Sequence, residues 1–129
     1  MLRMSPFRWK KKRILIADDE PSVRKVIKSC LAPQGYDVET AENGIDALDK
    51  LEKGKFDLLI LDQYMPEMKG LQVLETIIVS KKHRNMPVFM LTCESCMGTA
   101  ERAFELNAVK YIQKPFDIQN LVEKVNSLF

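Results

Sequence analysis

The 129-residue sequence lacks the features of an exported or membrane-embedded protein. No stretch approaches the roughly 20 apolar residues that a membrane-spanning helix needs. The opening residues, MLRMSPFRWKKKR, are positively charged but contain neither the apolar segment nor the small-residue cleavage site of a signal peptide. We therefore expect a soluble, cytoplasmic protein with one globular domain, because this length suffices for one core but not for two.

Cysteine and histidine, which form disulfides and bind zinc, are also scarce. The chain has three cysteines and one histidine, His83. An odd number of cysteines without an export signal argues against a disulfide framework. Cys93 and Cys96 are spaced as Cys-x-x-Cys, but a zinc site usually needs four ligands and a redox motif needs a thioredoxin-like setting. We interpret the cysteines as small, partly buried side chains, with a redox or metal role as the alternative.

Positive charge is concentrated at the start of the chain. Six of the 20 basic residues lie in the first 13 positions: Arg3, Arg8, Lys10, Lys11, Lys12 and Arg13. We expect residues 1–11 to form a flexible basic arm and residues 12–129 to form the folded domain. Such an arm can bind nucleic acid or an anionic membrane, but a solvated tail is the interpretation that we favour. We expect neither direct nucleic-acid binding by the domain nor membrane association.

From Arg13 onward, short apolar runs alternate with amphipathic stretches of helical period. The runs that predict strands are Arg13–Ala17, Asp37–Ala41, Phe56–Leu61, Pro87–Leu91 and Lys110–Gln113. The stretches that predict helices are 21–32, Gly44–Lys53, Leu71–Lys82, Ser95–Leu106 and a last one capped by Asp117. This alternation predicts an α/β fold: a doubly wound, five-stranded parallel sheet in the flavodoxin-like order 2-1-3-4-5, with five helices on both faces.

In that order, the first and third strands are neighbours, and their carboxyl ends deliver Asp18, Asp19 and Asp62 to one edge. Thr92 and Lys114 follow the fourth and fifth strands. Two carboxylates about 5 Å apart repel by about 3 kcal/mol at an effective dielectric of about 20, so the cluster needs a cation. Oxygen ligands alone favour Mg²⁺. Beside such an ion Asp62 would be placed as a nucleophile for phosphoryl transfer.

Four motifs resemble the receiver domain of bacterial two-component response regulators, of the chemotaxis-receiver type, over about residues 12–129. They are ILIADDEPSVRKVI, LLILDQYMPEMKG, VFMLTC and YIQKPF. The resemblance implies that Asp62 is the phosphoacceptor. It also implies that Mg²⁺ is held by Asp18, Asp19, Asp62 and the backbone carbonyl of Tyr64.

The resemblance assigns roles to further residues. Thr92, Tyr111 and Lys114 would respond to the phosphoryl group, and the bond from Lys114 to Pro115 would be cis. Tyr64 and Glu94 would border the path of the hydrolytic water and tune dephosphorylation. Gln63 departs from the family pattern, in which an apolar residue commonly follows the acceptor.

The function implied is a switch in a phosphorelay. A sensor histidine kinase, a phosphotransfer protein or acetyl phosphate would donate to Asp62, and the domain would catalyse its own phosphotransfer and dephosphorylation. The face formed by the predicted helix Ser95–Leu106, the predicted strand Lys110–Gln113 and the last helix would then change its preference for a downstream protein target. The sequence leaves open the identity of the kinase and target, and whether the protein is a monomer or a phosphorylation-dependent dimer.

Other interpretations fit parts of the sequence. The chain could be a receiver-like interaction module that is not phosphorylated, a stand-alone receiver, or a receiver fragment of a regulator with an output domain. A phosphatase resembling the haloacid dehalogenases needs a second Asp where Tyr64 stands. A flavin mononucleotide carrier is disfavoured because the acidic first loop would repel the flavin phosphate.

Overall fold

The computed structural model describes residues 10–92, 102, 105–106 and 110–129. Its sheet has five parallel strands: β1 (Arg13–Ala17), β2 (Asp37–Ala41), β3 (Leu58–Asp62), β4 (Val88–Thr92) and β5 (Lys110–Gln113). They are arranged in the order β2-β1-β3-β4-β5, which confirms the predicted order.

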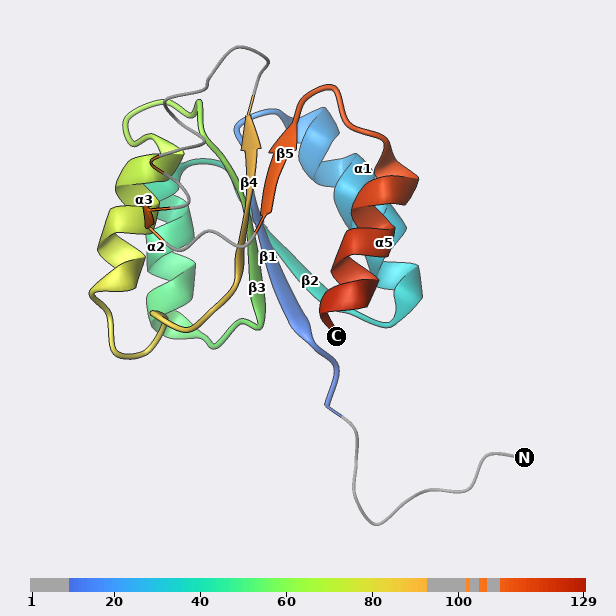
Figure 1. Ribbon diagram of the computed structural model, residues 1–129, viewed down its shortest axis with the longest axis horizontal. Helices are drawn as coiled ribbons and strands as arrows, with labels where there is room; N and C mark the ends of the chain where they lie inside the picture. Colours follow the sequence, from blue (N-terminus) through green and yellow to red (C-terminus); the bar gives the residue numbers. More distant parts are fainter. Residues whose placement is uncertain (1–9, 93–101, 103–104, 107–109) are drawn as a thin grey trace.

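Helices lie on both faces of this sheet (Figure 1). The described helices are α1 (Pro21–Leu31), α2 (Gly44–Lys53), α3 (Gly70–Ile78), α5 (Ile118–Leu128) and the short 3-10 helix η1 (Ala32–Gln34). One face is covered by α1 and α5, and the other by α2 and α3 (Figure 1). The predicted helix Ser95–Leu106 lies largely outside the described residues. None of the helices in the described part of the chain has the length and apolar character that crossing a bilayer requires.

The central strands are apolar throughout because both of their faces are covered. Along β3, Leu58 and Ile60 pack with the α1/α5 cluster, whereas Leu59 and Leu61 pack with the α2/α3 cluster. All four side chains have 0% exposure. Successive side chains of a strand point to opposite faces, so an unbroken apolar run is needed where neither face meets water.

Local signals set the starts of three helices. Pro21 occupies the first turn of α1, where its missing N–H group is no loss. Asn43 Oδ1 accepts a hydrogen bond of 2.7 Å from the Asp46 N–H group at the start of α2. Asp117 Oδ1 accepts one of 2.9 Å from the Gln119 N–H group, which confirms the predicted cap of α5.

The boundaries of two strands, β3 and β4, differ from the predictions. β3 begins at Leu58 instead of Phe56, because Phe56 packs under the Arg13 guanidinium group, 4.5 Å from its ring centroid. Both β3 and β4 extend one residue further than predicted, to Asp62 and Thr92. β4 also begins one residue later, after Pro87, which has no N–H group to donate to a neighbouring strand. The polar residues thus belong to the strand ends themselves.

The predicted end of α3 at Lys82 is wrong, because the helix ends at Ile78. The chain then turns toward α2. Lys82 Nζ donates to the Glu52 carbonyl at 2.7 Å, and His83 Nε2 donates to the Leu51 carbonyl at 2.6 Å. Carbonyls of a last helical turn have no partner within their own helix. The basic cluster, predicted to suit the end of α3, therefore serves the end of α2.

Candidate functional site

The carboxyl ends of the five strands and the loops that follow them form one edge of the sheet, which we call the carboxyl edge. β1 and β3 run side by side there, with Ala17 opposite Leu61, so the residues that follow Ala17 lie beside Asp62. Asp18 has 0% exposure and Asp62 has 3%, whereas Asp19 is exposed. Carboxylate oxygens of Asp18, Asp19 and Glu20 lie within 4.8 Å of one another.

Lys114 follows the outer strand β5, and its side chain extends to this acidic group. Its Nζ atom lies 2.9 Å from Asp18 Oδ2, 3.4 Å from Asp62 Oδ1 and 3.9 Å from Glu20 Oε1. The Lys114 N–H group donates to the Thr92 carbonyl at 2.6 Å, which ties the loop after β5 to the end of β4. The bond from Lys114 to Pro115 is cis, as predicted. The structure thus brings together Asp18, Asp62 and Lys114, three of the predicted site residues.

The charges of the site are set by burial and by one another. Burial, together with the charges of Asp18 and Asp19, raises the pKa of Asp62 to about 6, although Lys114 opposes the rise. Burial opposes the charge of Lys114, but the hydrogen bond to Asp18 and the charge of Asp62 outweigh it and raise the Lys114 pKa. Near pH 7 an ionised Asp62 therefore stands beside a protonated Lys114.

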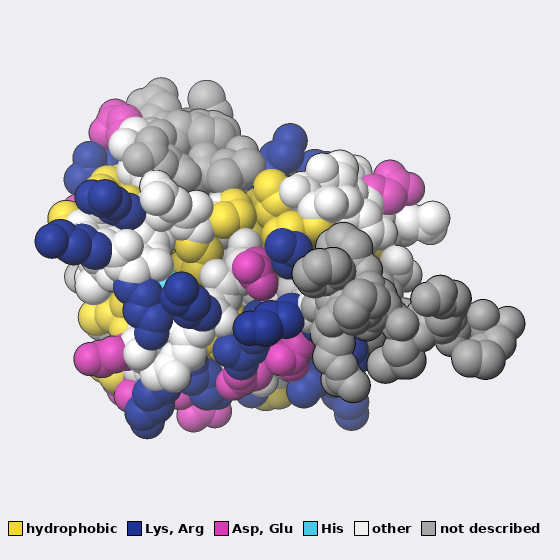
Figure 2. Space-filling model, turned by 90° about the horizontal axis from the view of Figure 1, so that it is seen from below, with side chains coloured by type: hydrophobic (Ala, Val, Ile, Leu, Met, Phe, Trp, Pro, Cys, Tyr) yellow, Lys and Arg dark blue, Asp and Glu magenta, His cyan; other side chains and the backbone are white. Residues whose placement is uncertain are grey.

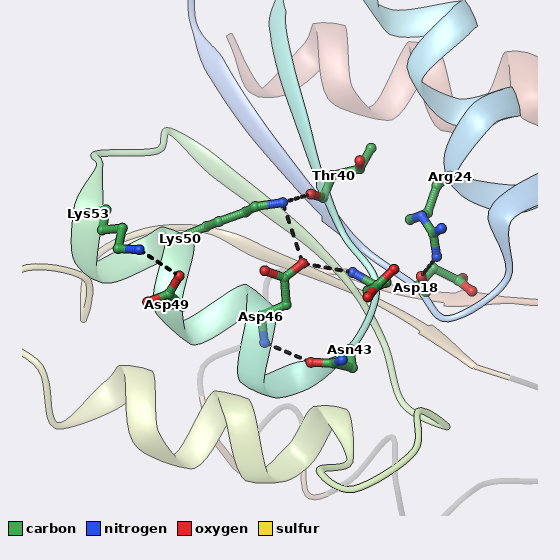
Figure 3. A network of polar contacts seen from close by, with 9 residues as sticks. Asp18, Arg24, Thr40, Asn43, Asp46, Asp49, Lys50 and Lys53 are labelled. Carbon is green, nitrogen blue, oxygen red and sulfur yellow. Dashed lines mark hydrogen bonds and ion pairs between the residues drawn. The ribbon is translucent and has the colours of Figure 1, made fainter.

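The backbone fixes Asp18 on both sides. Its N–H group donates to the Ala41 carbonyl at 3.1 Å, and its carbonyl accepts from Arg24 Nη1 at 2.7 Å (Figure 3). Its Oδ1 atom accepts from the Glu20 N–H group at 2.9 Å, while Oδ2 faces Lys114. The orientation of this buried carboxylate is therefore held by α1, β2 and the loop after β5 together.

Thr92 contributes a buried hydroxyl group at the end of β4. Its side chain has 0% exposure, and Oγ1 has no hydrogen-bond partner among the residues that the structure describes. The neighbouring strand ends at Asp62, which is opposite Leu91. A buried polar group without a partner costs about 1–3 kcal/mol, so the position favours a ligand atom that this hydroxyl can contact.

The loop after β3 lies very close to the start of α3. A Cβ atom on Gly70 would come within 3.0 Å of the Asp62 carbonyl oxygen, a contact that real Cβ atoms do not make. Only glycine allows this approach of the helix to the Asp62 backbone. Tyr64, the next predicted ligand, is 43% exposed, and Lys69 Nζ lies 5.4 Å from its ring centroid.

Of the remaining predicted residues, only Tyr111 is among those that the structure describes. Tyr111 is half-buried and packs against the α2/α3 cluster. Glu94, Cys93 and Cys96 lie outside the described residues.

Sequence reasoning assigned no role in the site to three contributors. Glu20 adds a third consecutive carboxylate, a signal that was present in Asp-Asp-Glu. The side chains of Arg24 and Gln63 bind backbone groups six and eight residues away, at Asp18 and Leu71, and no motif predicts these contacts.

The residues of the carboxyl edge fit a divalent cation. Four carboxylates lie near the single ammonium group of Lys114, and all of their ligand atoms are oxygens. They belong to Asp18, Asp19, Glu20 and Asp62. Mg²⁺ prefers one or two carboxylates and leaves room for water and substrate oxygens. The raised pKa of Asp62 indicates that the site lacks positive charge. The Thr92 hydroxyl, which has no partner among the described residues, indicates that the site also lacks one polar group.

The family model of the response regulator receiver domain matches residues 14–126. The chain belongs to this family. This receiver domain is also similar in structure to solved proteins that share more than a quarter of its sequence. Chemotaxis protein CheY4 of Vibrio cholerae is 29% identical, with a TM-score of 0.87, and the match covers 93% of this chain and 100% of that one.

Two further solved structures extend the comparison. A CheY-like receiver domain protein of Methanospirillum hungatei is 30% identical, with a TM-score of 0.87, over 92% of this chain and 94% of that one. Response regulator TrrA of Thermotoga maritima, solved in complex with Mg²⁺ and BeF, is 39% identical, with a TM-score of 0.80, over 92% and 99%. The receiver domain described here is thus CheY-like and belongs to two-component signalling.

Proposed function

We propose that this receiver domain is a phosphorylation switch in which Asp62 accepts the phosphoryl group. The observation that carries the proposal is the pairing at the end of β3. Asp62 is a buried carboxylate whose pKa is raised to about 6, and the Lys114 ammonium group lies 3.4 Å from its Oδ1 atom. Desolvation makes such a carboxylate a better nucleophile, while the lysine can neutralise charge on an incoming phosphoryl group.

In the transfer, an Asp62 carboxylate oxygen forms a bond to phosphorus while the bond from phosphorus to the donor's leaving group breaks. The leaving group is the imidazole nitrogen of a phosphohistidine or the carboxylate of acetyl phosphate. Phosphoryl transfer depends mainly on alignment and on charge stabilisation. Lys114, oriented by Asp18, supplies the second of these. The domain catalyses its own phosphorylation and does not act as an enzyme on a separate substrate.

Asp18, Asp19, Asp62 and the Tyr64 backbone carbonyl would hold Mg²⁺. When bound, this ion supplies positive charge that offsets the carboxylates and the phosphoryl oxygens. The acidic cluster of the carboxyl edge supports this assignment, as does TrrA, a relative solved with Mg²⁺ and BeF. Asp18 would act through a metal-bound water, because both of its oxygens already accept hydrogen bonds from the protein.

The phosphorylated state would be read through Thr92, Lys114 and Tyr111. The aspartyl phosphate adds charge and acceptor oxygens that attract the Thr92 hydroxyl and the Lys114 ammonium group. Tyr111 then moves inward, and the face formed by the predicted helix Ser95–Leu106, β5 and α5 changes its preference for a downstream protein. Hydrolysis resets the switch, with Tyr64 and Glu94 bordering the approach of water. The donor is a sensor histidine kinase or a phosphotransfer protein in the cytoplasm.

The test is incubation of the full chain with ³²P-labelled acetyl phosphate, with Mg²⁺ and with EDTA. Wild type should take up label only with Mg²⁺, and Asp62→Ala should fall to background. Asp57→Ala is a matched control, because it removes a carboxylate at the opposite edge of the sheet and should leave labelling unchanged. Equal labelling of wild type and Asp62→Ala would refute the assignment. Absence of labelling, together with an unchanged amide spectrum after addition of beryllofluoride and Mg²⁺, would favour an interaction module that is not phosphorylated.

A further inference from the structure

Gln63, which directly follows the proposed phosphoacceptor, connects three elements of the fold. Its N–H group donates to the Leu91 carbonyl of β4 at 2.9 Å, and its carbonyl accepts from the Gly70 N–H group at 2.9 Å. Its side-chain Oε1 atom accepts from the Leu71 N–H group at 2.7 Å. With 5% exposure, the residue is buried in the loop between Asp62 and α3.

We propose that Gln63 is a positioning residue for phosphorylation, and that its carboxamide holds the segment from Asp62 to Tyr64 in the geometry that binds Mg²⁺ and accepts the phosphoryl group. This inference rests on the proposed function. It assigns Gln63 an effect on the site through the backbone and no contact with the phosphoryl group.

The start of α3 explains why a polar side chain is needed here. The side chain of Lys69, the residue that precedes the helix, cannot accept hydrogen bonds, so it cannot cap the N–H groups of Gly70 and Leu71. Gln63 replaces such a cap from outside the helix: its backbone carbonyl binds the Gly70 N–H group and its side chain binds the Leu71 N–H group. An apolar residue at this position would leave the partly buried Leu71 N–H group without its partner.

The same contacts bear on the acceptor because the helix and the acceptor backbone touch. Gly70 approaches the Asp62 carbonyl so closely that no Cβ atom fits between them. A shift of α3 after loss of the Gln63 contact would therefore displace the Asp62 backbone. It would also release one side of the peptide that leads into Tyr64, whose carbonyl is a proposed metal ligand. Groups that orient ligands in this way commonly change metal affinity about 10–100-fold when they are removed.

Gln72 offers a matched control. It is also a glutamine at the start of α3, and its Oε1 atom accepts from the Lys69 N–H group at 2.8 Å. It is exposed and does not adjoin Asp62. If glutamine acts here only as a helix cap, Gln63→Met and Gln72→Met should both affect stability alone. If Gln63 positions the site, only Gln63→Met should change metal binding and phosphorylation.

The experiment uses the full chain of wild type, Gln63→Met, Gln63→Glu and Gln72→Met. The Mg²⁺ dissociation constant is measured by amide chemical-shift titration, and the initial labelling rate with ³²P-acetyl phosphate at saturating Mg²⁺. Gln63→Met should bind Mg²⁺ about tenfold more weakly and be labelled about tenfold more slowly. Gln72→Met should stay within about twofold of wild type. Gln63→Glu, which keeps an acceptor for Leu71, should bind Mg²⁺ at least as tightly as wild type.

Values for Gln63→Met within twofold of wild type would overturn the inference, and so would an equal loss in Gln72→Met. If Gln63→Met does not fold, the Leu71 amide resonance of wild type provides the test. Saturation with Mg²⁺ should shift the Leu71 amide resonance, and an unchanged resonance would overturn the inference. Wild type that neither binds Mg²⁺ nor takes up label would instead refute the proposed function itself.

Discussion

At the amino ends of the strands Arg13 is surrounded by acceptors, whereas at the carboxyl ends Asp18 and Asp62 face one another across Lys114. We call the first region the amino edge. There Arg13 contacts the carboxylates of Asp37 and Glu39 and the Lys55 carbonyl, and its guanidinium group lies over the Phe56 ring. Basic and acidic side chains lie close together over this face of the molecule (Figure 2).

The carboxyl edge has an excess of negative charge, part of which is buried at Asp18 and Asp62. Burial and like charge both raise the pKa of Asp62, and the Thr92 hydroxyl has no partner among the described residues. Such features oppose folding unless a ligand compensates them. The comparison shows that the two edges of one sheet contribute differently to stability. The contacts at the amino edge stabilise the fold, whereas the buried carboxylate and the unpartnered hydroxyl at the carboxyl edge cost stability.

The largest expected contrast is between two glycines. Gly70→Ala places a Cβ atom against the Asp62 carbonyl and should lower the free energy of unfolding by about 3 kcal/mol. Gly54→Ala, at the amino edge, has its tightest contact with the movable Arg13 guanidinium group, at 3.0 Å, and should cost less than about 1 kcal/mol. Urea unfolding of both variants measures the difference. Equal losses would show that the carboxyl edge is not the tighter region.

Removal of the buried charge should stabilise the protein. The folded-state pKa of Asp62, about 6, exceeds its usual value, so the unfolded carboxyl group gives up its proton more readily. Without Mg²⁺, wild-type stability should therefore rise as the pH falls from about 6 to about 4. Asp62→Asn should remove this slope and gain about 2 kcal/mol at pH 7.5. Urea unfolding in EDTA across this range is the measurement, and a wild type that loses stability over it, with no gain in Asp62→Asn, would contradict the account.

Loss of the central cation of the amino edge should have the opposite effect. Arg13→Met removes the contacts with Asp37, Glu39 and the Lys55 carbonyl while keeping an apolar side chain over Phe56. The Arg13 side chain is 32% exposed, so solvent screens these ion pairs and the loss should be about 1 kcal/mol. Thermal unfolding in low and high salt should show a smaller loss at high salt. A loss that does not depend on salt would mean that packing, and not charge, is responsible.

Backbone strain offers a smaller contrast. Glu67, in the loop before α3, has a φ of 70°, which is unfavourable for a residue with a Cβ atom. Glu67→Gly should stabilise the protein by about 1 kcal/mol. At the amino edge, Gly35 already provides glycine at a φ of 100°, so Gly35→Ala should destabilise by about the same amount. Chemical denaturation of the two variants should give changes of opposite sign, and changes of the same sign would contradict this reasoning.

The smallest expected effect concerns His83. Its Nε2 atom donates to the Leu51 carbonyl, and burial lowers its pKa despite that contact, with Lys82 and Lys55 adding to the decrease. The unfolded chain then binds the proton more readily, so this group should reduce stability as the pH falls through its ordinary pKa of about 6.5. The slope is opposite in sign to that of Asp62. His83→Gln should flatten it in unfolding measurements between pH 5 and pH 7.5, and an unchanged slope would exclude His83 as its source.

The sequence is enough to predict the features that depend on the periodicity of apolar residues and on which residues end the strands. The apolar run before Asp62 predicts a strand buried on both faces. The order of five alternating strands places Asp18 and Asp62 on adjacent ends, with Lys114 nearby. These inferences need only the geometry of parallel sheets.

Other features depend on contacts that sequence does not encode locally. The end of α3 at Ile78 follows from Lys82 and His83 reaching the last carbonyls of α2, about 30 residues earlier. The pKa of Asp62 depends on how deeply the folded chain buries it. The cap from Gln63 to Leu71 depends on the path of the loop between them. Each is a tertiary contact, so periodicity and motif spacing cannot reveal it.

The central claim is that carboxylates from the ends of β1 and β3 form one charge-binding site. The most direct test is to titrate the Asp62 carboxyl carbon by NMR, without and with Mg²⁺. The account predicts a pKa of about 6 without the ion and a clear decrease with it. A titration near the ordinary value of about 4 under both conditions would contradict it.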